Sequence, residues 1–401
     1  MTETSAMEYG AVLSATELRG AAPRADWDRW VRRGRAPAHN PGTTVFEHSW
    51  PLDIKQLAEL GINAVQLPIE WARLEPRQNH YDQAEIHHVR ELFTEAKQLG
   101  LAVWAVLVDG TLPGWFSEDE HGFADSHSRG LLWPRHIDWV GETFGDLVDG
   151  WIPQREPVHQ ALRSQLWGLA PPGRTDHARA AEAIRDCLLA DGEAWRLLAG
   201  TAPVAAYQTM RTIVGSFNDV KANRVAASLR GMAINSWVGA LTTGVISVPG
   251  AIDRSAPHLR NAFDRVIVEL RCPLMVDSSG AYSPYPREAT VGPTGLAPWP
   301  SASEENLRWV ADQMEGRSVI ASGRLADVAD DGRSRPDHVE TMMGIVADAA
   351  STTNVNGWWW SDPIDGYHWE YGHSISPGLI TADRHTTASA DAFKAIARPS
   401  R

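Results

Sequence analysis

The sequence has few of the features that would link it to a membrane, a metal or an oxidising compartment. Its 401 residues include only two cysteines, Cys187 and Cys272, which cannot form a disulfide framework and lie in no Cys/His cluster typical of zinc sites. No stretch approaches the ~20 apolar residues of a membrane helix, and the amino terminus has no basic segment followed by an apolar core. We therefore expect a soluble, unexported, cytoplasmic protein with no membrane partner.

Basic charge is also scarce. The chain has 37 lysines and arginines against 50 aspartates and glutamates, a formal net charge of -13. A polyanion would be repelled unless a local basic stripe attracted it, and we identify no such stripe. The chain also has no dinucleotide-binding fingerprint, phosphate loop or metal-binding motif. The sequence therefore predicts no nucleic-acid partner, no cofactor and no metal.

Apolar residues are plentiful enough for a large core. Hydrophobic residues make up 43% of the chain and charged residues 22%, which is ordinary globular usage. Tryptophan is in excess, with 18 residues against eight phenylalanines and seven tyrosines. We expect most of these indoles in the core, although an indole face also suits the apolar face of a sugar.

Short apolar runs alternate with longer amphipathic patterns along the chain, which indicates strands separated by helices. The predicted strands span residues 8–13, 63–69, 101–108, 148–153, 202–207, 264–270, 318–321 and 355–360. The predicted helices span residues 52–60, 84–99, 133–148, 176–198, 302–314 and 335–350. Eight such strands predict an α/β fold, a (β/α)8 TIM barrel in which residues 1–401 form a single domain. In this fold the functional residues follow the strands.

Several separated segments resemble, in the right order, those of glycoside hydrolase family 1, the retaining β-glucosidase-like family. Residues 63–76 are similar to its NAYRFSIEWSRIEP, 111–115 to TLPxWL, 154–157 to INEP, 168–173 to GxxPPG, and 360–369 to WSLLDNFEW with one inserted residue. Residues 10–20 match the spacing of its opening GxATSxYQxEG. The resemblance covers nearly the whole chain and implies the barrel fold and a sugar-containing small-molecule substrate.

The resemblance also implies two catalytic glutamates about 5 Å apart, an acid/base and a nucleophile. Glu156 matches the acid/base of the family's NEP motif, at the expected C-terminal end of the fourth strand. Residues 320–327 read IASGRLAD where the family has its TENG motif, so Ser322 occupies the nucleophile position. A serine is neutral and needs a neighbouring base to act as a nucleophile, so retaining hydrolysis is disabled. We interpret Ser322 as leaving room for a water or a substrate group.

Other positions that bind sugar in the family are altered as well. Gln66 replaces the arginine that pairs with the nucleophile, and this loss fits the loss at Ser322 because an arginine without its carboxylate would be a buried, unpaired charge. The further positions taken over from the resemblance are Glu17, Asp109, Arg155, Glu269, Trp360, His368 and Trp369, of which the two tryptophans remain aromatic. Arg155 either binds a substrate carboxylate or phosphate or balances Glu269 or Asp109. The altered set is a poor match for simple glucose.

Two classes of function fit these residues. In the first, Glu156 is the general acid or base of an enzyme that acts on a glycoside or cyclic polar metabolite without retention. Asp109, Glu17 or another carboxylate then activates water near Ser322, or the reaction is a transfer, elimination or rearrangement suited to specialised metabolism. In the second, the chain is a non-catalytic pseudo-glycosidase that binds a sugar or metabolite. The sequence makes no prediction of the oligomeric state.

Overall fold

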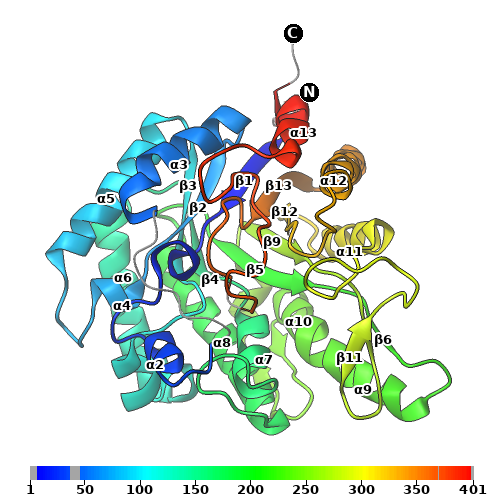
Figure 1. The fold of residues 1–401 in the computed structure, drawn as a ribbon. Helices are drawn as coiled ribbons and strands as arrows, with labels where there is room; N and C mark the ends of the chain where they lie inside the picture. Colours follow the sequence, from blue (N-terminus) through cyan, green and yellow to red (C-terminus); the bar gives the residue numbers. More distant parts are fainter. Residues whose placement is uncertain (1–6, 37–45, 369, 399–401) are drawn as a thin grey trace.

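Eight parallel strands form the centre of the molecule (Figure 1). The computed structural model describes residues 7–36, 46–368 and 370–398. Around the barrel the strands are β4 (Gly150–Gln154), β3 (Ala102–Val108), β2 (Ala64–Pro68), β1 (Glu8–Val12), β13 (Val355–Ser361), β12 (Ser318–Gly323), β9 (Arg265–Leu270) and β5 (Ala205–Met210). A bridge between Trp151 and Val204 joins the two ends of this order and closes the barrel. The predicted TIM barrel and all eight of its strands are confirmed.

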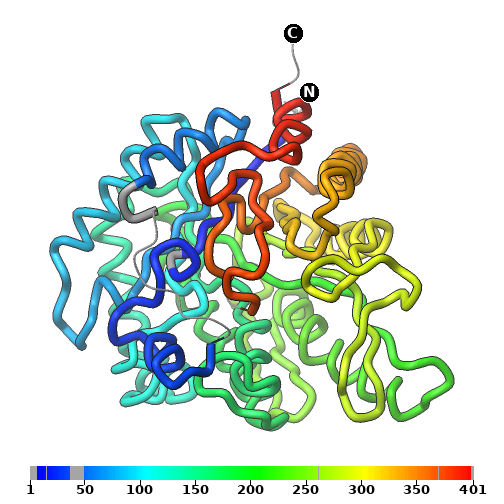
Figure 2. Tube along the Cα trace, in the orientation of Figure 1, coloured from blue at the N-terminus to red at the C-terminus, as the bar shows by residue number. Residues whose placement is uncertain are grey.

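Helices cover the outside of the barrel (Figure 1). The six predicted helices are present as α3 (Phe46–Leu60), α5 (Gln83–Gln98), α6 (Trp133–Phe144), α8 (His177–Leu198), α11 (Pro300–Gln313) and α12 (Ser334–Thr352). Capping residues fix their ends: the Asp82 carboxylate accepts from two backbone N–H groups at the start of α5, and Gly100, with φ 79°, follows its end. The helix α13 (Ala388–Ala397) lies beside the start of β1, so the two ends of the described chain lie close together (Figure 2).

The two largest groups of buried apolar residues form two layers, one between barrel and helices and one inside the barrel. Trp104 of β3 and Trp359 of β13 belong to the inner layer, with ring centres 6.0 Å apart. Two glycines make room for them, because a Cβ on Gly10 would overlap the indole of Trp359 and one on Gly150 that of Trp104. The inner layer therefore fills the barrel, and the polar side chains lie above it at the C-terminal ends of the strands.

The loops after the strands carry structure that the sequence did not predict. These elements are α1 (Ala15–Arg19), α2 (Asp26–Arg32), α4 (Trp71–Leu74), α7 (Pro157–Gln165), α9 (Val220–Arg230), α10 (Ser236–Thr243), and π or 3-10 turns η1 (Trp115–Asp119), η2 (Gly122–Ala124), η3 (Ser128–Leu132), η4 (Gly231–Asn235) and η5 (Pro257–Asn261). Outside the barrel, β6 (Ile213–Gly215), β10 (Leu274–Val276) and β11 (Tyr282–Pro284) form a small sheet, and β7 (Val245–Ile246) pairs with β8 (Arg254–Ser255). Across the described ranges, no helix has the length and apolar character needed to span a bilayer.

Candidate functional site

Glu156 follows β4, as the sequence predicted, and is buried. It is the residue before α7 and has a left-handed backbone (φ 49°, ψ 48°), which residues other than glycine adopt mainly in turns and functional sites. Its carboxylate accepts a short hydrogen bond from the Thr209 hydroxyl of β5. The Nη2 atom of Arg271 lies 3.3 and 3.4 Å from its two oxygens.

These neighbours keep Glu156 ionised. Burial alone would raise the pKa of this carboxyl group, but the positive charge of Arg271 and the Thr209 hydrogen bond outweigh burial and hold the pKa well below its ordinary value. At neutral pH Glu156 is therefore a carboxylate without a proton to donate. A role as general acid requires that this environment change.

Ser322 contacts the carboxylate of Glu269. Ser322, fully buried on β12, is paired in register with Glu269 of β9 and donates a hydrogen bond of 2.9 Å to its Oε2 atom. The same oxygen accepts from the hydroxyls of Tyr207 at 2.8 Å and Ser361 at 2.7 Å. We expected Ser322 to leave room for a water or a substrate group. In the structure the Ser322 hydroxyl contacts the carboxylate of the neighbouring strand, because paired residues present their side chains at the same height.

One arginine joins the two carboxylates. The Nε atom of Arg271 lies 3.3 Å from Oε1 of Glu269 while its Nη2 contacts Glu156. Sequence reasoning missed Arg271, because the strand was predicted to end at residue 270. The two-residue period of a strand nevertheless places Arg271 on the same face as Glu269, and Thr209 on the same face as Tyr207. Continuing this period past the strand ends would have found both residues.

Arg155 and Asp109 form a second buried ion pair at the barrel mouth. Nη1 of Arg155 lies 3.3 Å from Oδ1 of Asp109. Burial raises the pKa of Asp109, and the charge of Arg155 opposes this rise. Arg155 was expected either to bind a substrate anion or to balance a nearby carboxylate. The contact with Asp109 provides the carboxylate that the second interpretation requires. Its Nε atom is buried and, within the described parts of the chain, has no hydrogen-bond partner.

On the β1 and β13 side, Glu17, Asp362 and His368 lie around one small pocket. Glu17 shares a hydrogen bond with Asp362, which requires a proton on one of the two carboxyl groups. Burial and the charge of Asp362 raise the pKa of Glu17 well above its ordinary value, so Glu17 holds this proton. Both ring nitrogens of His368 face donors, Arg324 Nη1 at 3.2 Å and the Glu370 N–H at 3.1 Å. Burial lowers the pKa of His368 to about 4, so its ring is neutral.

Three predicted substrate-binding residues have different outcomes. Gln66 is fully buried on the inner face of β2, and its amide atoms lack hydrogen-bond partners among the described residues. The prediction for Trp360 was wrong: it packs in the outer layer against Phe393 of α13. Its neighbour Ser361 faces the barrel mouth, since successive strand residues alternate between faces. Aligning Ser361 with the first tryptophan of WSLLDNFEW also removes the inserted residue. Trp369 lies outside the described residues.

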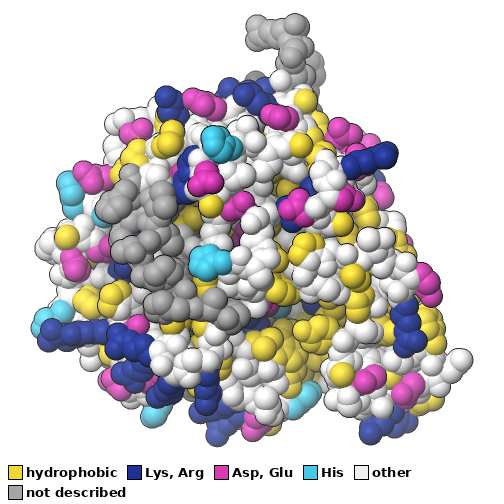
Figure 3. Space-filling model, viewed as in Figure 1, with side chains coloured by type: hydrophobic (Ala, Val, Ile, Leu, Met, Phe, Trp, Pro, Cys, Tyr) yellow, Lys and Arg dark blue, Asp and Glu magenta, His cyan; other side chains and the backbone are white. Residues whose placement is uncertain are grey.

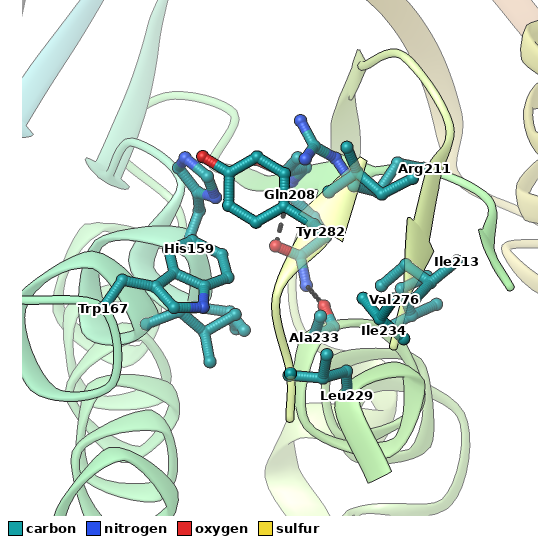
Figure 4. A pocket seen from close by; sticks show the side chains of 15 residues that line it. His159, Trp167, Gln208, Arg211, Ile213, Leu229, Ala233, Ile234, Val276 and Tyr282 are labelled. Atoms are coloured by element: carbon teal, nitrogen blue, oxygen red, sulfur yellow. Dashed lines mark hydrogen bonds between the residues drawn. The ribbon is translucent and has the colours of Figure 1, made fainter. Parts of the chain in front are cut away.

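An apolar pocket adjoins Glu156 between α7 and the small outer sheet (Figure 4). Its volume is about 40 Å³, and His159 and Thr209 form the wall nearest to Glu156. His159 and Trp167 of the α7 side face Tyr282 and Ile213 across the pocket, and Gln208 is held by the Ala233 carbonyl (Figure 4). Burial lowers the pKa of His159 to about 3, so its ring is also neutral. The pocket can hold an uncharged group beside the carboxylates.

Comparisons with known proteins agree with the fold and the motifs. Residues 14–222 match the family model of Glycosyl hydrolase family 1. Beta-glucosidase 12 of Arabidopsis thaliana is 20% identical over 464 aligned positions that cover 97% of this chain and 90% of that protein. Beta-glucosidase 21 of Oryza sativa subsp. japonica is 25% identical over 177 residues, 42% of this chain, and the match spans only 34% of its length. A beta-glucosidase structure from Exiguobacterium marinum superposes with a TM-score of 0.87 at 17% identity, covering 100% of this chain and 99% of that chain.

Proposed function

Because the chain belongs to glycosyl hydrolase family 1, we propose that it is an enzyme that acts on a glycoside through Glu156 and Glu269. The observation that carries this proposal is the carboxylate of Glu269, which three hydroxyl groups hold at the position that Ser322 cannot serve. Two carboxyl groups that flank a glycosidic bond, one as acid and one as base, are sufficient for hydrolysis by single displacement.

In this reaction Glu156 donates a proton to the leaving oxygen as the bond from that oxygen to the anomeric carbon breaks. Glu269 takes a proton from the water whose oxygen forms the new bond. Substrate that enters between the carboxylates must first separate Arg271 from Glu156. Removal of this positive charge lets the pKa of Glu156 rise, so that the group can carry the proton it donates.

The substrate combines a sugar with an uncharged apolar part. The relatives are named as beta-glucosidases, which favours a sugar, and the apolar pocket beside His159 and Thr209 favours an apolar group next to the bond that breaks. The altered residues Glu17 and Arg155 favour a sugar other than glucose. Such a substrate fits the tailoring of a specialised metabolite.

The test compares the wild-type protein with Glu156→Gln and Glu269→Gln on aryl β-glycosides that carry different sugars. We expect turnover of a sugar other than glucose, reduced at least about 100-fold by either substitution. The first product should have the inverted anomeric configuration by NMR. A matched control is Glu70→Gln, which alters another buried glutamate, one that pairs with Arg73 at 2.5 Å. Turnover that survives Glu156→Gln or Glu269→Gln unchanged would contradict the proposal.

A non-catalytic binder is the second candidate, and Arg271 is the observation that favours it. This arginine lies at ion-pair distance from both carboxylates, and Ser322 supplies no nucleophile. Glycoside binding without turnover across the panel would establish this alternative and refute the enzymatic proposal.

A further inference from the structure

A large cavity opens beside the carboxylate site, on the β3 and β4 side of the barrel. It has a volume of about 580 Å³ and lies between the end of α2, the helix α7 and the helix α8. Arg155 lines its inner end and so connects it to the Asp109 and Glu156 region. The cavity is large enough for a sugar with a substituent, since ligand pockets typically measure about 300–1,000 Å³.

Four arginines line this cavity: Arg33, Arg155, Arg174 and Arg179. Within the described ranges, neither Arg33 nor Arg174 has a carboxylate at ion-pair distance. The contact of Arg179 with Glu182, at 3.4 Å, joins two side chains that are 60% and 45% exposed and therefore contributes little. Arg155 adds a buried Nε atom without a hydrogen-bond partner among the residues the structure describes. The cavity thus has several guanidinium groups free to bind a ligand.

The acidic residues of the cavity wall already have ion-pair or hydrogen-bond partners within the protein. Asp186 lies 3.0 Å from Arg185 and 3.5 Å from Arg129, and Glu118 is in contact with Arg29. Asp26 accepts hydrogen bonds from the backbone N–H groups of Trp27 and Leu112. Burial raises the pKa of Asp26 to about 7, so part of its population is neutral at physiological pH. The cavity therefore has a positive potential within a chain of net charge -13.

The surface beside the cavity strengthens this potential. Lysine and arginine side chains gather near α2 at the lower left of the space-filling view (Figure 3). The exposed arginines in and around α2 are Arg24, Arg29, Arg32, Arg33 and Arg35. Two of them are paired, Arg29 with Glu118 and Arg32 with Asp28.

We propose that the ligand of this cavity is an acidic sugar, whose carboxylate or phosphate group binds Arg174, Arg179 and Arg33 while its neutral part extends past Arg155 toward Glu156. The inference rests on the proposed function, because it assigns the substrate of the same site. A guanidinium group matches both anions with two parallel N–H donors.

The test is isothermal titration of the full chain with glucuronate, glucose 6-phosphate, glucose and inorganic phosphate. We expect both acidic sugars to bind at least about tenfold more tightly than glucose or inorganic phosphate, and less tightly as salt increases. Arg174→Ala/Arg179→Ala should abolish this preference. The matched control, Arg224→Ala/Arg254→Ala, removes two exposed arginines from α9 and β8 and should keep it.

Equal binding of glucose and the acidic sugars, or no detectable binding of any of them, would overturn the inference. So would binding of inorganic phosphate as tight as that of glucose 6-phosphate, or a preference that survives Arg174→Ala/Arg179→Ala. Calorimetry needs no turnover, so the two proposals fail separately. A protein that hydrolyses neutral glycosides but shows no acidic preference refutes only this inference, and one that binds acidic sugars without turnover refutes only the enzymatic proposal.

Discussion

The two sides of the barrel mouth hold buried acids in opposite states. On the arginine side, formed by Glu156, Glu269 and Arg271, one guanidinium group contacts both carboxylates. On the proton side, formed by Glu17, Asp362 and His368, one carboxyl group is protonated and the imidazole is neutral. Burial is similar on the two sides, so the neighbouring charges decide which groups carry protons.

Both sides also place an acid in the left-handed region of the backbone within two residues of the end of a barrel strand. Glu156 has φ 49° after β4, and Asp362 has φ 54° after β13. Such conformations cost about 1–3 kcal/mol and persist where the surrounding structure enforces them. The strain is therefore common to both sides, and what differs is the partner: Arg271 for Glu156 and a protonated carboxyl group for Asp362.

The largest expected effect comes from breaking the arginine side. Arg271→Met leaves two buried carboxylates without their shared counter-charge, and we expect a loss of about 3–5 kcal/mol in the free energy of unfolding at pH 7.5. Arg271→Lys keeps the charge and should lose clearly less. Urea unfolding measures both. A loss below about 1 kcal/mol for Arg271→Met would show that the guanidinium group does not stabilise the pair.

On the proton side, His368 makes the free energy of unfolding depend on pH. Its folded pKa of about 4 lies below the ordinary value of 6.5, so protons favour the unfolded chain. The stability that His368 contributes is present above pH 6.5 and is lost as the pH falls toward 4, by about 3 kcal/mol in total. His368→Gln should remove this loss.

Thermal unfolding between pH 4 and 7 measures the difference between the His368→Gln variant and the wild-type protein. The control is His87→Gln, which changes a histidine with a side chain that is 75% exposed, and its curve should follow that of the wild type. Curves for His368→Gln and wild type that stay parallel across this range would contradict the assignment of a neutral ring.

The barrel could be predicted because its pattern is local. The predicted helix 84–99 and strand 101–108 match α5 (Gln83–Gln98) and β3 (Ala102–Val108), since a polar helix face, a glycine stop and an apolar run are each visible in the sequence. Glu156 could be located for the same reason, because it lies in the short segment after a predicted strand. The loop helices α2 and α7 were missed because their short patterns compete with turn signals.

The side chains that meet across strands could not be predicted in the same way. Residues 358–360 are all tryptophan, so the pattern cannot say which of them faces the barrel interior, and Trp360 was assigned to the wrong face. The contact between Glu269 and Ser322 depends on the register of β9 against β12, which is set by the closure of the whole barrel. The contact between Glu269 and Ser322 was therefore visible only in three dimensions.

A smaller loss of stability is expected when a hydroxyl donor to Glu269 is removed on the arginine side. Ser322→Ala removes one of the three hydroxyl donors to Glu269 and should cost about 1.5 kcal/mol, the lower end for a hydrogen bond to a charged group. Ser361→Ala removes another donor to the same oxygen and should cost a similar amount. Urea unfolding at pH 7.5 gives both values. If Ser322→Ala costs nothing while Ser361→Ala does, Ser322 is a space-filling residue rather than a support for Glu269.

Glu17→Gln should have its smallest effect near pH 4.5, because the amide donates to Asp362 as the protonated carboxyl group does. The raised pKa of Glu17 means that the folded protein binds the proton more tightly than the unfolded chain, so the wild type loses stability as the pH rises above the ordinary glutamate range. The variant lacks this loss and should be the more stable protein at pH 9, with the difference disappearing toward pH 4.5. Urea unfolding at both pH values measures the difference, and Glu91→Gln, on an exposed part of α5, is the control. A Glu17→Gln variant that loses stability with rising pH as steeply as the wild type would place the proton elsewhere and remove the contrast between the two sides.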